Sequence, residues 1–421
     1  MTAVATTADG VIPRQTPASV KFLGREAAYW RLRIKGAVLL VFTLGLYRFW
    51  FATDVRRFLW SHTEIGGETL EYTGLAGELL GGFLLAIAIV VPLYTGIAVA
   101  ALALDAAEGV IAGIAFVLLV LLGQMALYRA RRYRLTHTVF RGVRFDQHGA
   151  AWRYALYALA WWTLIVVTLG LAYPWAQAGL QRFKMRHTSY GDLAGSFAGS
   201  GTALFLRGLP IWLAVFGPLV GAFVALSRMV DWDALNRMIA AGGNSPLAVL
   251  VGGAGAAPFV VAGTAAVASI LAALSLYPLF AATMMRWWIS GLRFGAVSVR
   301  SHLRTWQIYR IYLRFVGLLT LFLLALAVIV GVGVALFNLA VRPNRDVAEL
   351  LTSTFTVILY VVAALGASTI YQVAVTFALW RQSAQSAELS GAAALAEVRA
   401  AGAPSSALGE GLADALGVGG I

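Results

Sequence analysis

The chain has 421 residues, of which 60% are hydrophobic and 12% are charged, and its mean hydropathy is +0.79. A typical soluble domain has about 25% charged residues, so this composition excludes an ordinary soluble enzyme, a disordered protein and a fibrous repeat. The chain carries 32 Lys and Arg against 19 Asp and Glu and has no cysteine. We therefore expect an all-α polytopic membrane protein whose basic loops face anionic lipid. Nucleic acid is not expected as a partner.

Eight apolar stretches follow one another along the chain. Six have the length of ordinary membrane-spanning helices, which need about 20 apolar residues. The other two, 29–51 and 152–175, carry Thr-Leu-Gly-Leu followed by Trp, a pattern that indicates a break in the helix. The residues of the two break elements are Thr43, Gly45 and Trp50, and Thr168, Gly170 and Trp175. The six ordinary stretches are 79–104, 109–128, 203–226, 247–280, 311–337 and 351–380.

Charge counting separates two topologies for these stretches. If all eight cross the membrane, Lys and Arg divide almost evenly between its two sides. If 29–51 and 152–175 enter and return on one side, only the turns 105–108, 227–246 and 338–350 lie outside, and they hold just four arginines. The positive-inside rule favours this second arrangement of six spans and two re-entrant segments, with both termini cytoplasmic. Eight full spans remain the alternative.

One short pattern recurs: Arg, an aromatic residue, three residues, then His-Thr. Its copies are Arg57-Phe58…His62-Thr63, Arg132-Tyr133…His137-Thr138 and Arg182-Phe183…His187-Thr188, with a degenerate copy at Arg286-Trp287…Gly291-Leu292. The first and third copies lie 125 residues apart, which indicates a degenerate internal repeat. The residues after each His-Thr alternate around glycine and predict short cytoplasmic β-hairpins. Because isolated hairpins are marginally stable, we expect these to pack on one another or on the membrane face.

These elements divide the chain into five parts. We expect a flexible N-terminal tail over 1–20, membrane repeat 1 over 21–150, membrane repeat 2 over 151–310, a C-terminal helix pair over 311–380 and a flexible C-terminal tail over 381–421. The last part is rich in Ala, Gly and Ser, which is the reason for expecting mobility there.

In the helix-break elements, the repeated Arg-aromatic motif and the hairpin residues, the sequence resembles the YjgN-like family of bacterial inner-membrane proteins, a domain of unknown function. The stretches that carry the resemblance are Thr43-Leu44-Gly45-Leu46-Tyr47…Trp50, Arg56-Arg57-Phe58, Thr63…Gly67…Leu70-Glu71-Tyr72, Phe140-Arg141-Gly142-Val143-Arg144-Phe145 and Thr168-Leu169-Gly170-Leu171…Pro174-Trp175. The resemblance covers roughly residues 20–380. It implies a multi-pass protein of the bacterial cytoplasmic membrane and supplies no activity, cofactor or ligand residues.

The basic residues at the ends of the apolar stretches are the candidate contacts for anionic phospholipid. They are Arg56, Arg57, Arg131, Arg132, Arg182, Lys184 and Arg286. Interleaved Tyr, Trp and Phe side chains suit the headgroup region of a membrane. The plainer interpretation is that these cations fix the topology and extend to the interface, and both roles are compatible.

The three repeated histidines, His62, His137 and His187, pose a second question. Three neutral imidazoles would suit Zn²⁺ with an open fourth position. The plainer interpretation is that each His caps or starts its hairpin, and we favour this structural role. The sequence does not tell whether they converge, so we predict no metal and no cofactor. No phosphate-binding loop, His-Glu-x-x-His or Gly-x-Ser-x-Gly pattern is present, and we expect no enzyme and no catalytic residue.

Two functional classes fit this sequence. The first is a non-enzymatic membrane scaffold or lipid-interacting protein of the inner membrane. The second is a transporter or channel for a small or amphipathic solute, which duplication and glycine-broken helices would suit. Ion-coupled carriers usually keep an ionisable group near midplane, whereas Asp and Glu are absent from the cores of 79–104, 109–128, 247–280, 311–337 and 351–380. This absence favours the first class, and the sequence leaves the oligomeric state open.

Overall fold

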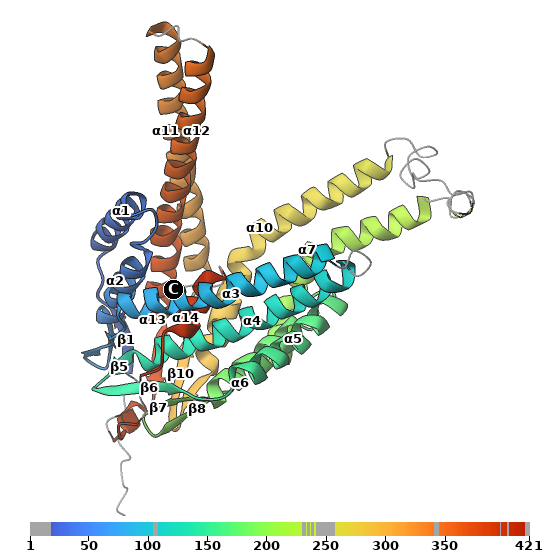
Figure 1. The fold of residues 1–421 in the computed structure, drawn as a ribbon. Helices are drawn as coiled ribbons and strands as arrows, with labels where there is room; N and C mark the ends of the chain where they lie inside the picture. The colour runs from blue at the N-terminus through green and yellow to red at the C-terminus, as the bar shows by residue number, and fades with distance from the viewer. Residues whose placement is uncertain are drawn as a thin grey trace, which may run out of the picture.

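The computed structural model describes residues 18–103, 108–229, 257–340, 345–395, 397–401 and 404–416, with 233, 236 and 240 as isolated positions. Most of the expected turns 105–108 and 227–246 lies outside the described residues, as do 341–344 and the first 17 residues of the expected N-terminal tail. The rest of the expected turn 338–350 is helical. Long helices extend from one end of the molecule, where short strands gather (Figure 1).

The strands form one antiparallel sheet in the order β3-β2-β1-β11-β10-β9-β8-β7-β6-β5-β4. Its two edge strands, β3 and β4, are consecutive in the chain and only Leu70 separates them. One residue spans about 3.4 Å, so the two edges meet and the sheet closes into a ring. The strands are β1 (Ala18–Phe22), β2 (Thr63–Ile65), β3 (Glu68–Thr69), β4 (Glu71–Tyr72), β5 (Thr138–Phe140), β6 (Val143–Gln147), β7 (Thr188–Tyr190), β8 (Leu193–Phe197), β9 (Leu292–Phe294), β10 (Val297–Ser301) and β11 (Ala387–Ser390).

Around the ring the same order of elements recurs: a helix, a strand pair and the next helix. Sequence neighbours supply four of the pairs, and the fifth joins the two ends of the chain, because β1 pairs with β11 through Ala18↔Leu389 and Ser19↔Glu388. The strands of the two expected repeats, 21–150 and 151–310, therefore lie in one common sheet.

Apolar side chains fill the inside of this ring. Phe140, Val143 and Tyr190 are buried in one cluster, against which side chains from distant strands pack. A second cluster contains β1, β10 and β11 residues. Ile65, Phe294 and Leu395 touch both clusters although they come from β2, β9 and the segment after β11. The ring is thus a small closed core, with the chain after β11 packed against it.

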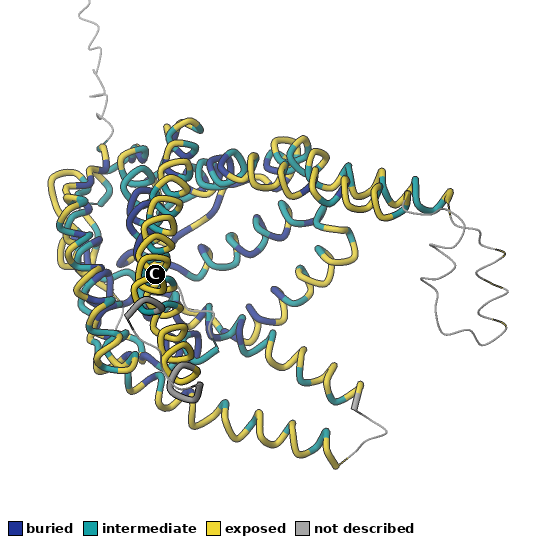
Figure 2. The backbone as a smooth tube through the Cα atoms, turned by 90° about the horizontal axis from the view of Figure 1, so that it is seen from above, coloured by how far each residue is buried: buried dark blue, intermediate teal, exposed yellow. Residues whose placement is uncertain are grey.

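In the described part of the chain, six helices are long and apolar enough to cross a membrane, judged by length and composition. They lie side by side as three pairs that diverge from the sheet (Figures 1 and 2). Figure 2 shows that residues along their outer lengths are mostly exposed, whereas buried residues gather where the pairs come together. The pairs are α3 (Ala76–Ala103) with α4 (Glu108–Thr136), α7 (Gly201–Met229) with α10 (Ala257–Gly291), and α11 (Thr305–Ala340) with α12 (Arg345–Tyr371). Helix α12 continues through a π-helical turn, η2 (Gln372–Phe377), into α13 (Ala378–Gln385).

The two Thr-Leu-Gly-Leu elements lie where short helices end. Helix α1 (Glu26–Phe42) is followed by α2 (Arg48–Ser61), and α5 (Ala151–Val167) by α6 (Tyr173–Arg186). In the first turn the Thr43 hydroxyl donates to the Leu39 carbonyl at 2.7 Å and accepts from the Tyr47 amide at 3.0 Å. Gly45 follows at a φ of 88°, a left-handed conformation that suits glycine.

The second turn repeats this geometry. The Thr168 hydroxyl donates to the Leu164 carbonyl at 2.7 Å and accepts from the Ala172 amide at 3.0 Å, and Gly170 has a φ of 87°. Trp50 lies in α2 and Trp175 in α6, each shortly after its turn. Each short pair therefore reverses after a helix of 17 residues, and neither pair contains a helix among the six candidate spans.

Two sequence expectations need correction. The fold is mostly helical but not all-α, and the expected hairpins are not separate units, because their strands also pair with neighbours to complete the ring. The region 381–421 is not simply a flexible tail: it contains most of α13, all of β11, η3 (Ala392–Leu395) and α14 (Leu408–Ala415). The expected N-terminal tail likewise contributes Ala18, Ser19 and Val20 to β1. Composition missed these elements because their partners lie hundreds of residues away.

Helix α14 docks between α3 and α4 through close backbone contacts. A Cβ at Gly411 would overlap the backbone of Gly82 in α3, and a Cβ at Gly409 would overlap Arg129 in α4. Leu412 and Ala413 are buried in the same cluster as alanines of α3 and α4. The glycines that made the C-terminal region look flexible are therefore what allows it to pack.

Candidate functional site: a buried polar network and an arginine-lined cavity

The repeated histidines end helices. In each copy the imidazole Nδ1 lies 2.7–2.8 Å from the backbone carbonyl four residues earlier, and the ring packs against the aromatic side chain of that residue. The following Thr hydroxyl donates to a helix carbonyl in the same way. The pairs of ring and carbonyl are His62 with Phe58, His137 with Tyr133, and His187 with Phe183. Within the described ranges no group of three or more His, Cys, Asp or Glu side chains could hold a metal ion.

The predicted lipid contacts lie around the ring rather than in one patch, each near the end of a helix that leads into a strand. Three of them donate to a backbone carbonyl 17 residues later, just before the next helix. The pairs are Arg57 with Gly74, Arg182 with Gly199, and Arg286 with Leu303, at 3.1, 3.0 and 3.4 Å. These arginines tie the end of one helix to the start of the next.

The other predicted contacts have more enclosed positions. Arg131 donates to the Thr188 hydroxyl at 2.9 Å and also contacts the Gln147 side-chain oxygen. The Nε of Arg132 is buried without a hydrogen-bond partner. Burial, together with the charge of Arg131, lowers the pKa of Lys184 to about 8. None of these positions tests lipid contact, which stays a prediction.

Arg56 belongs to a buried ion-pair network that reaches the C-terminal region. It is 4% exposed, pairs with Glu410 of α14, and donates to the Tyr72 hydroxyl at 3.1 Å. Arg134 of α4 approaches the same carboxylate at 3.3 Å. Burial alone would lower the pKa of Arg56, but Glu410 and Tyr72 outweigh it and leave that pKa raised. The carboxylate of Glu410 thus joins α2, α4 and α14.

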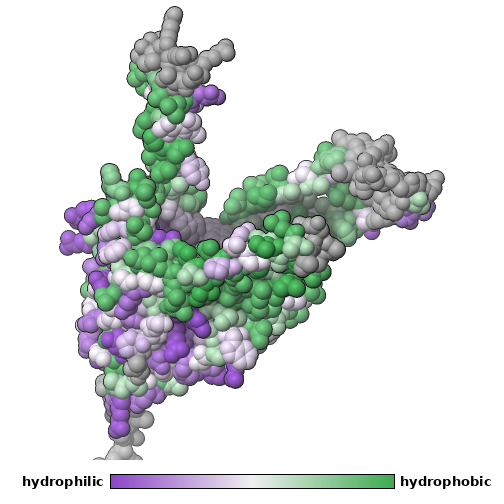
Figure 3. All heavy atoms as spheres, in the orientation of Figure 1, coloured by the Kyte–Doolittle hydropathy of each residue, from purple (hydrophilic) through white to green (hydrophobic). Residues whose placement is uncertain are grey.

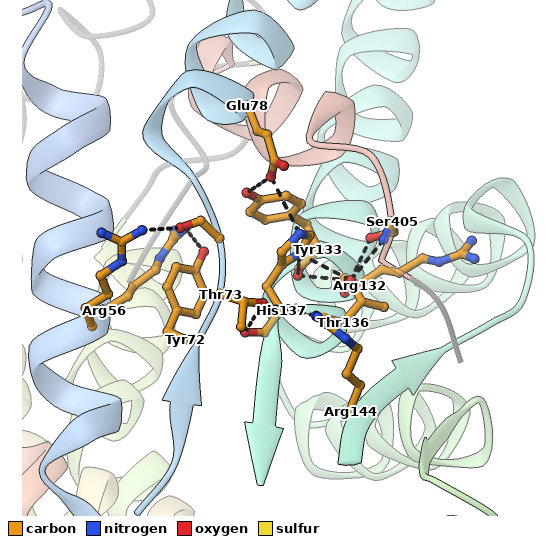
Figure 4. A network of polar contacts seen from close by, with 12 residues as sticks. Arg56, Tyr72, Thr73, Glu78, Arg132, Tyr133, Thr136, His137, Arg144 and Ser405 are labelled. Carbon is orange, nitrogen blue, oxygen red and sulfur yellow. Dashed lines mark hydrogen bonds and ion pairs between the residues drawn. The ribbon is translucent and has the colours of Figure 1, made fainter. Parts of the chain in front are cut away.

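A second set of polar contacts continues beside this one (Figure 4). The Tyr133 hydroxyl donates to Glu78 at 2.7 Å, and His137 Nε2 lies 3.5 Å from the same carboxylate. On the other side, the Thr136 and Ser405 hydroxyls are 2.9 Å apart, which anchors the residues just before α14. The start of α3, the end of α4 and the C-terminal region are therefore held together by hydrogen bonds.

A cavity of about 290 Å³ adjoins this network. Helices α1, α2 and α3, the π-helical turn η2 and helix α14 form its walls. The polar side chains that line it are Arg33, Arg48, Arg56, Gln372, Glu410 and Asp414, and Phe49, Phe51, Val55 and Leu79 supply apolar surface. Arg48 pairs with Asp414, to which its Nε donates at 3.0 Å. The cavity offers electrostatic recognition and hydrogen bonding.

Sequence reasoning missed most of this site. It selected Arg56 but not Arg33, Arg48, Glu410 or Asp414. Glu410 and Asp414 are four residues apart, a spacing that places both on one face of a helix, and this was the available signal. The basic partners offered none, because their pairing with residues about 350 positions later is not local.

A family model described as "Bacterial protein of unknown function (DUF898)" matches residues 17–415. The chain belongs to this family. The match is consistent with the resemblance to YjgN-like proteins and covers both the ring and helix α14. No curated protein and no solved structure matches the chain. Membership of the family therefore supports a bacterial protein of unknown function, and the cavity has to be interpreted from its own chemistry.

Proposed function

We propose that this protein is a multi-pass protein of the bacterial inner membrane that interacts with anionic phospholipid and acts as a scaffold, without enzymatic chemistry. In this arrangement the sheet ring and both termini face the cytoplasm. The observation that carries the proposal is the division of the surface in Figure 3: hydrophobic residues cover the long helices and hydrophilic residues gather around the sheet end. A bilayer surrounds such apolar helices favourably, whereas water does not.

The filled ring supports a binding or scaffolding role over transport. Side chains from β2, β7 and β9 meet inside it, and the segment after β11 packs against the same core. A solute crossing the membrane along the axis of the ring would have to displace this apolar core. Basic residues at the helix ends next to the ring suit the negatively charged headgroups of the cytoplasmic leaflet.

Cysteine labelling tests the proposed orientation, because the chain has no native cysteine. Ser19→Cys in β1 and Ser196→Cys in β8 replace exposed serines on different strand pairs of the ring. We expect a membrane-impermeant maleimide to label both only after the inner membrane is permeabilised. Labelling of either residue in intact spheroplasts would contradict the shared cytoplasmic face.

Native mass spectrometry of gently extracted protein tests the lipid interaction. Anionic phospholipid is expected to remain bound in preference to zwitterionic lipid when both are supplied in equal amounts. Equal retention of the two lipids, or of neither, would argue against the proposed partner.

The alternative function is a transporter or channel for a small or amphipathic solute, and the polar cavity is the observation that favours it. Ala52 lines that cavity. If Ala52→Cys is labelled from both sides of the membrane in reconstituted vesicles, the cavity belongs to a transport path and the alternative is preferred. Labelling from a single side of the membrane supports the binding role.

A further inference from the structure

The charges that line the cavity do not balance. Arg33, Arg48 and Arg56 carry three positive charges, and Glu410 and Asp414 carry two negative charges. Glu410 pairs with Arg56 and Asp414 pairs with Arg48. Within the described part of the chain no carboxylate forms an ion pair with Arg33, so its guanidinium is the excess charge.

Arg33 is held in place even though it has no counterion. Its residue is 8% exposed, and its guanidinium carbon lies 4.5 Å from the centre of the Phe51 ring. Phe51 also packs so closely on Gly36, one turn further along α1, that a Cβ there would overlap the ring. The buried Arg33 Nε has no hydrogen-bond partner. A buried cation of this kind is stabilised when an anion approaches it.

A second unsatisfied group lines the same cavity. The side-chain oxygen of Gln372 is buried without a partner, and Gln372 begins the π-helical turn η2 between α12 and α13. A side-chain amide can also present its NH₂ group after rotation, which makes Gln372 a donor for an anion. Single π-helical turns inside helices often mark functional sites. The hydroxyl of Tyr29, one turn before Arg33, is buried and interacts with the Arg33 side chain, but as a neutral group it does not compensate the positive charge.

We propose that the cavity is a binding site for one phosphate-type anion, held by Arg33 and Gln372 and bordered by the Arg48–Asp414 pair. A planar guanidinium can donate two parallel hydrogen bonds to phosphate oxygens. Pockets for drug-sized molecules run from roughly 300 to 1,000 Å³, so a cavity of about 290 Å³ suits a headgroup rather than a whole lipid. Where the bound anion is a lipid headgroup, this inference rests on the proposed function.

A neighbouring groove suits the apolar part of such a ligand. Trp30 and Ile34 of α1, Phe322 of α11 and Ile370 of α12 line an apolar pocket beside the two elements that present Arg33 and Gln372. Ile34 follows Arg33, and Ile370 lies two residues before Gln372. A phospholipid headgroup and a free phosphate share the same anion chemistry, and the groove favours the lipid as the source.

Thermal unfolding of the full-length protein in a mild detergent tests the site, with its 13 tryptophans as the fluorescent reporter. The probes are short-chain phosphatidic acid, short-chain phosphatidylcholine and inorganic phosphate. We expect phosphatidic acid to raise the melting temperature of the wild type and Arg33→Gln to weaken that response at least tenfold in concentration. Arg31→Gln, an exposed arginine on the same helix, is the matched control and should respond like the wild type.

The possible outcomes distinguish a lipid headgroup from a free anion, and they show whether the site binds an anion at all. A response to phosphatidic acid alone identifies a lipid headgroup, and an equal response to phosphate identifies a free anion; both support the site. The site is overturned if the wild type responds to neither phosphatidic acid nor phosphate, or if Arg33→Gln responds like the wild type. If Arg33→Gln does not fold, Gln372→Leu is used in its place, with the same expectation. Anionic lipid that stays bound to Arg33→Gln at wild-type stoichiometry would reject this site while leaving the lipid-interacting function intact.

Discussion

At the scale of single residues, Glu410 connects three helices of the described network. The residue is 7% exposed, and its carboxylate faces Arg56 and Arg134, which come from two different helices. Removing one partner of a buried ion pair leaves the other charge buried and uncompensated, which is far worse than losing a surface pair. This side chain therefore contributes to the attachment of α14, together with the Arg48–Asp414 pair and the packing of α14 against α3 and α4.

We predict that Glu410→Gln lowers the free energy of unfolding by about 3 kcal/mol, because Gln keeps the size but cannot neutralise the two arginines. Thermal unfolding in detergent measures the change, and trypsin cleavage after Arg399 reports whether the C-terminal region has been released. Glu397→Gln is the control, since Glu397 is exposed. Equal stability of the two variants would show that the pair with Arg56 contributes little.

Lys184 gives the protein a pH dependence of known sign. Its pKa falls from 10.5 to about 8 in the folded protein, because burial and Arg131 both oppose the charged form. Between these values the unfolded chain binds more protons than the folded one, so stability rises as the pH rises from about 8 towards 10.5. The gain is at most about 3 kcal/mol. We predict that the rise is reduced in Lys184→Met, measured as the difference in melting temperature between the two proteins across this range; parallel curves would contradict the assignment.

At the scale of elements, the Thr-Leu-Gly-Leu turn is the best example of a local signal that determines structure. Its threonine, its glycine and its two short helices could all be read from the sequence, because every hydrogen bond of the turn lies within five residues. Gly45 has a φ of 88°, and a Cβ added there would have no neighbouring atom within 4 Å. A substitution at this position consequently tests backbone strain without a steric clash.

We predict that Gly45→Ala destabilises the protein by about 1–2 kcal/mol, the cost of a left-handed conformation for an L-residue. Gly170→Ala should have the same effect, because its φ of 87° is equivalent. Gly81→Ala in α3 is the control: it is helical, with nothing within 4 Å of an added Cβ, and alanine favours a helix. Melting temperatures in one detergent provide the comparison. An equal loss of stability in the control and in Gly45→Ala would show that the positive φ is not the cause.

Elements whose partners are remote in sequence were the ones that could not be predicted. Four copies of the repeat could be recognised from the sequence. In each, an aromatic residue follows the arginine, and after three further residues comes His-Thr or, in the degenerate copy, Gly-Leu. Arg381 stands six residues before β11, as Arg57 stands six before β2, but Gln382 and Ser386 replace the recognisable neighbours. The sequence therefore concealed the fifth strand pair, and with it the closure of the ring. Helix α14 was hidden for a related reason, since its glycines are favourable only against the helices that they contact.

At the scale of the whole molecule, the two ends of the chain complete the ring. Strand β1 lies between β2 and β11, pairing Val20 with Ile65 on one side and Ser19 with Glu388 on the other. Without β1 the strands β2 and β11 would each present an unpaired edge, and such edges promote association with other chains. The closed ring is thus a protection against aggregation as well as a core for the helices.

We predict that deleting residues 1–24 converts the protein into aggregates or lowers its melting temperature sharply, whereas deleting residues 1–17 does not. The longer deletion removes all of β1, and the shorter one keeps every strand pair intact. Size-exclusion chromatography with light scattering distinguishes a monodisperse species from aggregates in the same detergent. Since the two shortened chains differ only by residues 18–24, equal monodispersity and equal melting temperatures would mean that β1 is dispensable and that the helices alone hold the molecule together.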